Sequence, residues 1–311
     1  MLVSGTTEEG YIHRNYHAPH AKRGSLGNFS SFAYISDNEI EWENRDLITN
    51  KRAQAITIHG SSAHHKKIKD DFLFLYELDS FKGLKFLSIP VDFLPLIRWE
   101  HEAIRLMHLH INDPINGDLW KLFKEKRLPQ FPSSVFQKLI TLELPCPPKG
   151  WPGFNIKNFP ALKWFATELE EFDRSGLTLK SISESPSIVG YGLFDPKGQD
   201  VLTHIPVNIE SLGIWRATAK KFNFYRIGSF EKLKHLQLMG FPTVFDIHWI
   251  ANLPNLEELE IRSFRGIMNA QLLLNMKKLR HLKIDFISDK SYLSSEDKAT
   301  LCNKIKYCSL D

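Results

Sequence analysis

The apolar residues of this chain recur in a short pattern, apolar-x-x-apolar-x-apolar, in which x is mostly polar. Three clear copies start 23 residues apart. They are Leu233/Leu236/Leu238, Leu256/Leu259/Ile261 and Leu279/Leu282/Ile284. The last two apolar positions alternate with polar ones, so each copy predicts a short strand with one buried face. Equal spacing between such strands indicates an internal repeat.

Further copies with less regular spacing cover most of the chain. They are Ala53/Ile56/Ile58, Leu84/Leu87/Ile89, Ile104/Met107/Leu109, Leu139/Leu142/Leu144, Ile209/Leu212/Ile214 and Ile305/Cys308/Leu310, with degraded copies from Leu162 and Leu179. Many copies have another apolar residue three positions earlier, namely Phe81, Phe136, Phe159, Phe230, Leu253, Met276 and Cys302. One unit cannot bury its apolar face alone, so stacked units are expected to share a continuous core.

The pattern resembles that of the leucine-rich repeat family, L-x-x-L-x-L-x-x-N-x-L. The resemblance covers about residues 53–311 and is strongest over 209–289. It implies an α/β solenoid, with a curved parallel sheet on the concave side and short helices and loops on the convex side. The alternative is an ordinary α/β domain with several Leu-rich strands.

The sequence departs from the family at the position that usually holds a buried asparagine. The best copies have Phe241, Phe264 and Ile287 there, and only the copy that starts at Ile104 keeps an asparagine, Asn112. We therefore expect phenylalanine packing to replace the asparagine ladder, which would account for part of the 22 phenylalanines.

The chain is expected to have two parts, an N-terminal cap or extension over 1–50 and the solenoid over 51–311, with the terminal repeat at 305–310. Alternation over 29–40 predicts one or two strands. Asp246, Asn269 and Ser294 are predicted to cap helices on the outer side. The glycines and prolines of 183–203 predict a long loop.

Composition and charge narrow the class of protein. Of the 311 residues, 42% are apolar and 24% are charged, as in a globular chain, and the net charge of +4 is too small to imply nucleic acid. The N-terminus lacks the pattern of a signal peptide, and no apolar run is long enough to span a membrane, so we expect a cytoplasmic protein. The three cysteines, Cys146, Cys302 and Cys308, contain no Cys-x-x-Cys pair, which argues against a disulfide framework.

Catalytic motifs are absent from the sequence. It contains no glycine-rich phosphate loop and no Gly-x-Ser-x-Gly elbow, and His101-Glu102 is followed by Arg105 where a zinc protease needs histidine. His108 and His110 alternate along one strand and are interpreted as exposed side chains. We expect no catalytic residue, metal or cofactor; the alternative is a metal-dependent enzyme with a histidine-containing site.

A basic cluster over 216–234 offers a second alternative. It consists of Arg216, Lys220, Lys221, Arg226, Lys232 and Lys234, interleaved with Phe222, Phe224 and Tyr225. Basic and aromatic residues together can bind single-stranded nucleic acid. The favoured interpretation is that the aromatic residues pack under the outer face and that the cluster is solvated or binds an acidic protein.

The strand positions that face away from the core predict a binding surface on the concave side. These residues are His59, Arg105, His108, His110, Glu143, Trp164, Glu168, Trp215, His235, Gln237, Met239, Glu258, Glu260, Arg262, His281, Lys283 and Asp285. Trp164 and Trp215 are the strongest candidates, because exposed tryptophans are frequent binding hot spots. The alternative for Trp164, which lies in a degraded copy, is a buried position.

The sequence thus predicts a non-enzymatic module that binds another protein and that exists as a monomer or in complex with this partner. Neither nucleic acid nor a membrane is the expected partner. By analogy with the family, an immunity protein that inhibits a toxin is favoured, and an effector that engages a host protein is the alternative.

Overall fold

The structure is a computed structural model. It describes residues 32–35, 42–43, 45–58, 75, 77–98, 106–112, 137–144, 156–168, 187–194, 196, 201–216, 223–241 and 243–310. The chain divides into two compact units, Met1–Thr167 and Glu168–Asp311. None of the described helices is long and apolar enough to cross a membrane.

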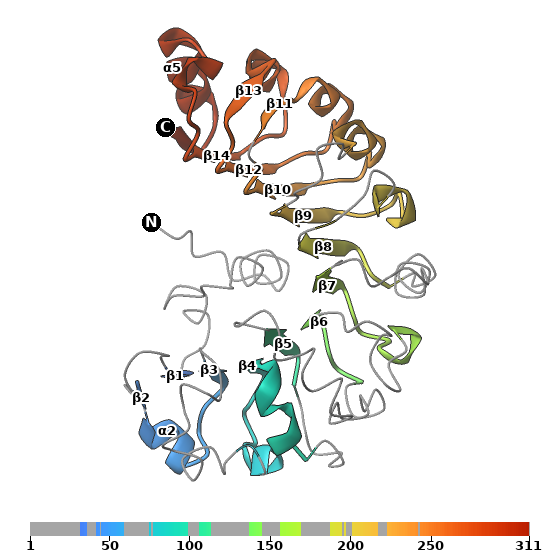
Figure 1. The fold of residues 1–311 in the computed structure, drawn as a ribbon, viewed down its shortest axis with the longest axis vertical. Helices are drawn as coiled ribbons and strands as arrows, with labels where there is room; N and C mark the ends of the chain where they lie inside the picture. Colours follow the sequence, from blue (N-terminus) through green and yellow to red (C-terminus); the bar gives the residue numbers. More distant parts are fainter. Residues whose placement is uncertain are drawn as a thin grey trace. The chain divides into compact units, whose positions relative to one another are not determined.

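The strands of the first unit form a sheet in the order β2-β1-β3-β4-β5-β6-β7 (Figure 1). Strand β1 pairs antiparallel with β2 and parallel with β3, and the strands after β3 continue in parallel. Its elements are β1 (Phe32–Ile35), β2 (Trp42–Glu43), α2 (Arg45–Thr49), β3 (Ala55–Ile58), β4 (Phe86–Pro90), the 3₁₀ helix η3 (Val91–Leu96), β5 (His108–Asn112), β6 (Thr141–Leu144), η5 (Ile156–Asn158) and β7 (Trp164–Glu168).

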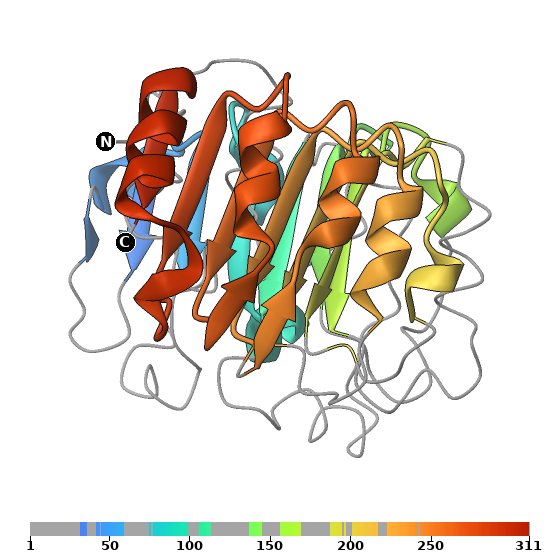
Figure 2. The same cartoon turned by 90° about the horizontal axis from the view of Figure 1, so that it is seen from above.

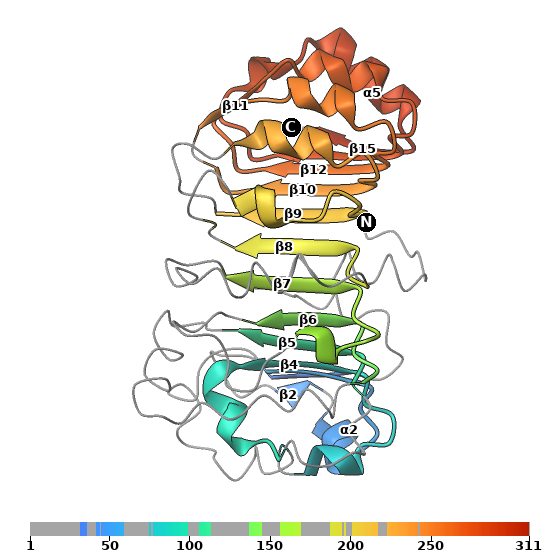
Figure 3. The ribbon, with the colours of Figure 1, turned by 90° about the vertical axis from the view of Figure 1, so that its right-hand side faces the viewer.

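The second unit has a parallel sheet in the order β8-β9-β10-β12-β14-β15 (Figures 1 and 3), and β11 and β13 form a separate parallel pair (Figure 1). Its elements are β8 (Gly190–Phe194), η7 (Val201–His204), β9 (Ser211–Trp215), η8 (Phe224–Ser229), β10 (His235–Met239), β11 (Val244–Asp246), η9 (His248–Asn252), β12 (Glu258–Arg262), β13 (Gly266–Met268), η10 (Ala270–Asn275), β14 (His281–Asp285), η11 (Lys290–Tyr292), α5 (Ser295–Lys304) and β15 (Tyr307–Leu310).

Equivalent apolar residues of successive repeats lie side by side in the second unit. Leu236 pairs with Leu259, and Leu259 pairs with Leu282, and all three are buried. The short helices lie on one face of these strands and cover this core (Figure 2, orange and red). The predicted leucine-rich repeat architecture, an α/β solenoid with a parallel sheet, is therefore confirmed by the strand register.

Phenylalanines occupy the layer where the family has asparagine. Phe241 and Phe264 are buried and stack with their ring centroids 4.9 Å apart. Phe245 packs on Phe264 at 4.7 Å, and Phe224 packs on Phe245 at 4.8 Å. The predicted replacement of the asparagine ladder by aromatic packing is confirmed in these repeats.

The predicted register of one copy in the first unit is wrong. Strand β5 aligns Leu109 with Leu87, and the buried residues are Leu106, Leu109 and Ile111. The copy therefore starts at Leu106 instead of Ile104. Asn112 consequently lies opposite Pro90, at the end of the strand, and does not occupy the asparagine position of the family.

The loop predicted over 183–203 contains a strand. Strand β8 is part of a further repeat copy, Ile188/Tyr191/Leu193, and all three of these residues are buried. The glycines of this segment led to the prediction of a loop, because glycine is unfavourable in strands. In the structure, Gly192 pairs with Gly213 of β9 on the outward face, and the apolar residues of β8 form its buried face. The degraded copy from Leu179 lies outside the described residues.

Of the three predicted helix caps, Ser294 is confirmed, Asp246 lies one residue before the N-cap Ile247, and Asn269 is at the N-cap position without a capping hydrogen bond. The Ser294 hydroxyl accepts a hydrogen bond from the Asp297 amide at 3.0 Å at the start of α5. Asp246 accepts one from the His248 amide at 2.9 Å at the start of η9. Asn269 precedes η10, but its side chain donates to Asp246 at 2.7 Å instead of capping its own helix. Alternation over 29–40 correctly predicted β1, whereas the assignment of 1–50 to a cap and 51–311 to the solenoid stays a prediction.

The residue directly after each strand has a left-handed conformation in four successive repeats. The φ angles are 53° at Arg216, 76° at Gly240, 60° at Ser263 and 55° at Phe286. Glycine adopts this conformation without a steric penalty, whereas for other residues it costs roughly 1–2 kcal/mol of conformational free energy. Three of these four strand ends are therefore strained.

We expect opposite effects from two substitutions at this position. Gly240→Ala should lower the free energy of unfolding by about 1 kcal/mol, because alanine is strained in this conformation. Ser263→Gly should raise it by about 0.5 kcal/mol, because the relief of strain is partly offset by the greater freedom of glycine in the unfolded chain. The midpoints of urea unfolding measure both changes. Two shifts of the same sign would contradict a common left-handed turn.

Candidate binding face

The strands of the second unit have one face on the core and one face directed away from it. We define the open face as the outward residues of β9, β10, β12 and β14, on the side of the sheet opposite the described helices of this unit (Figure 2). They are Ser211, Gly213, Trp215, His235, Gln237, Met239, Glu258, Glu260, Arg262, His281, Lys283 and Asp285. The parallel register arranges them in rows that run across the strands.

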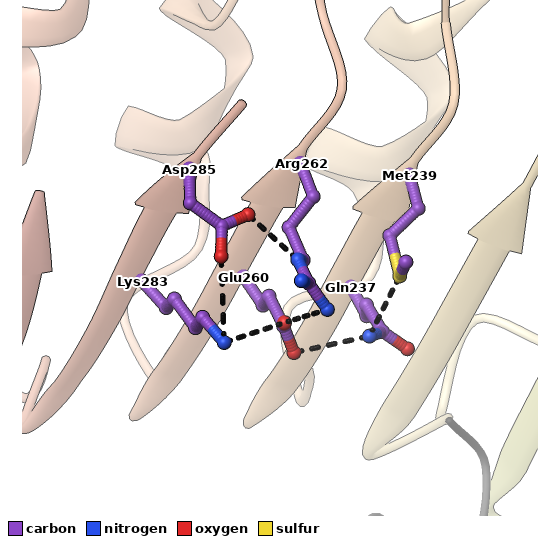
Figure 4. Close-up of polar contacts among 6 residues, drawn as sticks. All are labelled: Gln237, Met239, Glu260, Arg262, Lys283 and Asp285. Carbon is purple, nitrogen blue, oxygen red and sulfur yellow. Dashed lines mark hydrogen bonds and ion pairs between the residues drawn. The ribbon is translucent and has the colours of Figure 1, made fainter. Parts of the chain in front are cut away.

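Charged residues of the open face pair both along β12 and β14 and across these two neighbouring strands (Figure 4). Arg262 Nε lies 2.6 Å from Asp285 Oδ1, and Arg262 Nη1 lies 3.5 Å from Glu260 Oε1. Lys283 Nζ lies 3.4 Å from Asp285 and 3.9 Å from Glu260. The two cations and two anions compensate one another, so this part of the face is polar without a net charge.

The network continues onto β10. The Gln237 amide donates to Glu260 at 3.0 Å and to the Met239 sulfur at 3.1 Å. Nearby, the Ser211 hydroxyl and His235 Nδ1 share a hydrogen bond at 2.9 Å. Gln237 is buried, whereas His235, Met239, Glu258 and His281 are half-buried. The side chains are thus held in place while part of each remains accessible.

Trp215 lies on β9, at the edge of the open face away from the charged residues of β12 and β14. A side chain built on Gly213 would meet the indole ring, with its Cβ only 1.9 Å from Trp215 Cη2, so the ring lies flat over this glycine. The ring also stacks on Phe194, with the centroids 4.8 Å apart. Neither Gly213 nor Phe194 was predicted to be part of this face. A glycine two residues before a tryptophan in a strand is nevertheless a signal that another group approaches the backbone closely.

The prediction that the two tryptophans are exposed is wrong. Only 3% of Trp164 and 5% of Trp215 is exposed. Trp215 lies on the open face as predicted. Because Gly213 has no side chain, however, the indole ring packs flat against the sheet and is buried. For Trp164, the alternative of a buried position is confirmed. Both tryptophans pack against neighbouring residues, so they are weaker candidates for binding hot spots than predicted.

His108 and His110 were expected to be exposed, and this expectation is wrong as well, because only 6% of each is exposed. His108 Nδ1 shares a hydrogen bond with the Thr141 hydroxyl at 2.9 Å. Burial, helped by the charge of Lys85, lowers the pKa of His108 to about 3, so its ring is neutral at ordinary pH. His108 therefore serves as a hydrogen-bonding group in a packed row.

His110 connects two neighbouring strands. Its Nδ1 lies 3.1 Å from the Ser88 hydroxyl and its Nε2 lies 2.9 Å from Glu143 Oε1. Serine, histidine and carboxylate in one chain can activate a nucleophile. However, only 3% of Ser88 is exposed, and its strand lies between two parallel neighbours that engage the backbone amides. This geometry favours a structural role over acyl transfer.

The described residues contain no group of three or more His, Cys, Asp or Glu side chains that could hold a metal ion. His59 and Arg105 lie outside the described residues, and so does the side chain of Glu168. The binding role of the remaining predicted residues stays a prediction. The structure brings nine of them together on the open face, from His235 to Asp285.

The basic cluster is only partly described, since Lys220, Lys221 and Phe222 lie outside the described residues. Arg216 and Lys232 are exposed and Arg226 is half-buried, whereas Lys234 Nζ pairs with Glu210 at 2.9 Å. Phe224 packs against Phe241, as expected for an aromatic residue under the outer face, while Tyr225 is exposed. The packing of Phe224 agrees with the favoured interpretation, and whether the cluster is solvated or binds an acidic protein stays a prediction.

Comparison with known proteins finds similarity of fold only. No family model and no curated protein matches the sequence. An internalin from Listeria monocytogenes has 12% identity and a TM-score of 0.42, with 96% of this chain and 86% of that chain covered. A leucine-rich repeat protein from Leptospira interrogans has 14% identity and a TM-score of 0.36, with coverages of 86% and 74%.

A third similar structure is the leucine-rich repeat ectodomain of a plant membrane receptor kinase from Arabidopsis thaliana, in complex with Casparian strip integrity factor 2. It has 12% identity and a TM-score of 0.30, with 89% of this chain and 40% of that chain covered. The Leptospira and Arabidopsis structures are leucine-rich repeat proteins, and the likeness of this chain to them is one of fold.

Proposed function

We propose that this chain is a non-catalytic module that binds another protein through the open face of its second unit. One observation carries the proposal: polar and apolar side chains of four parallel strands form one surface and are already held in place by contacts with one another. Ordering side chains on binding costs free energy, so a preorganised surface binds at a lower cost. Repeat folds typically use such faces for binding.

The residues suited to contact a partner are the half-buried ones. His235, Met239 and Lys283 each keep part of their side chain accessible. Gln237 and Glu260 are more deeply placed and support them. We propose a partner that presents hydrogen-bonding groups to the network of Glu260, Arg262, Lys283 and Asp285 and an apolar group to Met239. The inhibition of a toxin and the cytoplasmic location stay predictions of the sequence.

Affinity capture from cells that naturally make the protein tests the open face. Wild-type chain should retain a protein whose yield falls at least fivefold for the double variant His235→Ala, Lys283→Ala, because both side chains lie on this face. Lys277→Ala is the matched control, because Lys277 is an exposed lysine in the turn before β14. Equal yields of every captured protein with all three chains would refute the open face as the binding site. Thermal melts establish that the variants are folded.

A further inference from the structure

Two cysteines that are separate in the sequence meet at the end of the second unit. Cys302 lies in the last part of α5 and Cys308 lies in β15, after a short turn. Their Sγ atoms are 2.6 Å apart, and both thiols are free. The sequence spacing argued against a disulfide framework, whereas the turn between helix and strand brings this one pair together.

Both cysteines sit on hydrogen-bonded backbone, Cys302 within its own helix α5 and Cys308 on a strand that the neighbouring repeat anchors. The Ile305 amide donates to the Leu301 carbonyl at 2.8 Å, and the Tyr307 amide donates to the Arg280 carbonyl at 3.0 Å. Cys308 pairs with Leu282 in the parallel register of β14 and β15. Cys302 is exposed and Cys308 is half-buried. A small reagent can thus reach the pair, and no rearrangement of these anchors is needed to join it.

We propose that Cys302 and Cys308 form a redox-responsive modification site, in which a disulfide made by exchange with a small disulfide such as oxidised glutathione ties α5 to β15. The Cys302 thiolate attacks the external disulfide, forms a mixed disulfide and releases one glutathione. The Cys308 sulfur, after losing its proton to water, then attacks the Cys302 sulfur and releases the second glutathione. Two protein thiols are oxidised and one external disulfide is reduced to two thiols.

The two thiols have different parts in this exchange. Burial, followed by the contact with Cys302, raises the pKa of the Cys308 thiol to about 12. Since the thiolate is the nucleophile, the exposed Cys302 takes the first step and closure by Cys308 is the slower one.

The bond would strengthen the attachment of α5 and β15 to the sheet. Among the described strands, β15 pairs with β14. A cross-link limits the conformations of the unfolded segment and thereby favours the folded one. This role is independent of the proposed binding face.

Peptide mapping of the full chain tests the proposal. After incubation with oxidised glutathione, alkylation and trypsin digestion, peptides 299–304 and 307–311 should appear linked, and reduced glutathione should abolish the link. Cys308→Ser should instead accumulate glutathione on Cys302. Cys146→Ser should keep the link and serves as the control. Separate alkylated peptides, or disulfide-linked dimers, from the oxidised wild-type chain would overturn the proposal.

Limited proteolysis tests the consequence of the bond. We expect cleavage after Lys304 and Lys306 in the native chain to be at least fivefold slower for the oxidised than for the reduced protein. Cys302→Ser should be cleaved at the reduced rate under both conditions. Equal rates for oxidised and reduced wild-type chain would overturn the stabilising role.

Discussion

Replacing Phe264 with asparagine is expected to lower the free energy of unfolding by about 3–5 kcal/mol, as for loss of a large buried aromatic side chain. Only 2% of Phe264 is exposed, and its ring contacts Phe241 and Phe245. The family places asparagine here, but the equivalent residues in the flanking repeats are Phe241 and Ile287, which offer an amide no side-chain partner. An unpaired buried amide adds to the loss.

Phe264→Leu is the matched control. It removes the ring but keeps an apolar side chain, so the expected loss is about 1.5 kcal/mol or less. Urea unfolding at equilibrium measures both variants. If the asparagine variant were as stable as the leucine variant, the aromatic layer would not be what replaces the asparagine ladder.

A methyl group added at Gly213 is expected to destabilise the protein by about 1–3 kcal/mol, the usual range for overpacking. The new Cβ would lie 1.9 Å from Trp215 Cη2 and 2.4 Å from Cζ2, so the indole ring must leave its place against Phe194. Trp215→Ala alone should cost about 3–5 kcal/mol. In that background, Gly213→Ala should cost almost nothing, because the ring that it displaces is already gone.

The four chains form a double-mutant cycle, and urea unfolding should give a coupling free energy of about 1–3 kcal/mol. Gly83→Ala is the control, since its Cβ would meet only Gln54 Cγ at an ordinary 3.7 Å. It should change the stability by less than about 0.5 kcal/mol. Additive effects of the Gly213 and Trp215 substitutions would show that the ring does not rest on this glycine.

The repeat and its buried residues were predictable because they depend on periodicity. The copies at Leu233, Leu256 and Leu279 have regular spacing, and each predicted strand occurs in the predicted register. The prediction failed where glycine replaced side chains on the outward face, as in β8, and where a neighbouring apolar residue offered a second register, as at Ile104. Local pattern alone does not distinguish these cases, because strand pairing decides them.

The outward side chains were predictable in their direction but not in their exposure. Alternation places Trp215 and His110 on the outward face, yet both are buried. Exposure depends on the side chains that share a row and on what neighbouring strands contribute to it. Trp215 lies over Gly213, two residues earlier on its own strand, and stacks on Phe194 of β8. His110 lies between Ser88 and Glu143, which belong to distant parts of the sequence.

The sequence by itself determined the leucine-rich repeat class, the buried positions of most strands and the aromatic layer, because each follows from the spacing of apolar residues along one chain. Only the tertiary structure decided which outward residues stay accessible, how the charges from Glu260 to Asp285 pair, and that Cys302 meets Cys308. These depend on contacts between strands or across a turn, where register and side-chain direction set distances that no local pattern contains.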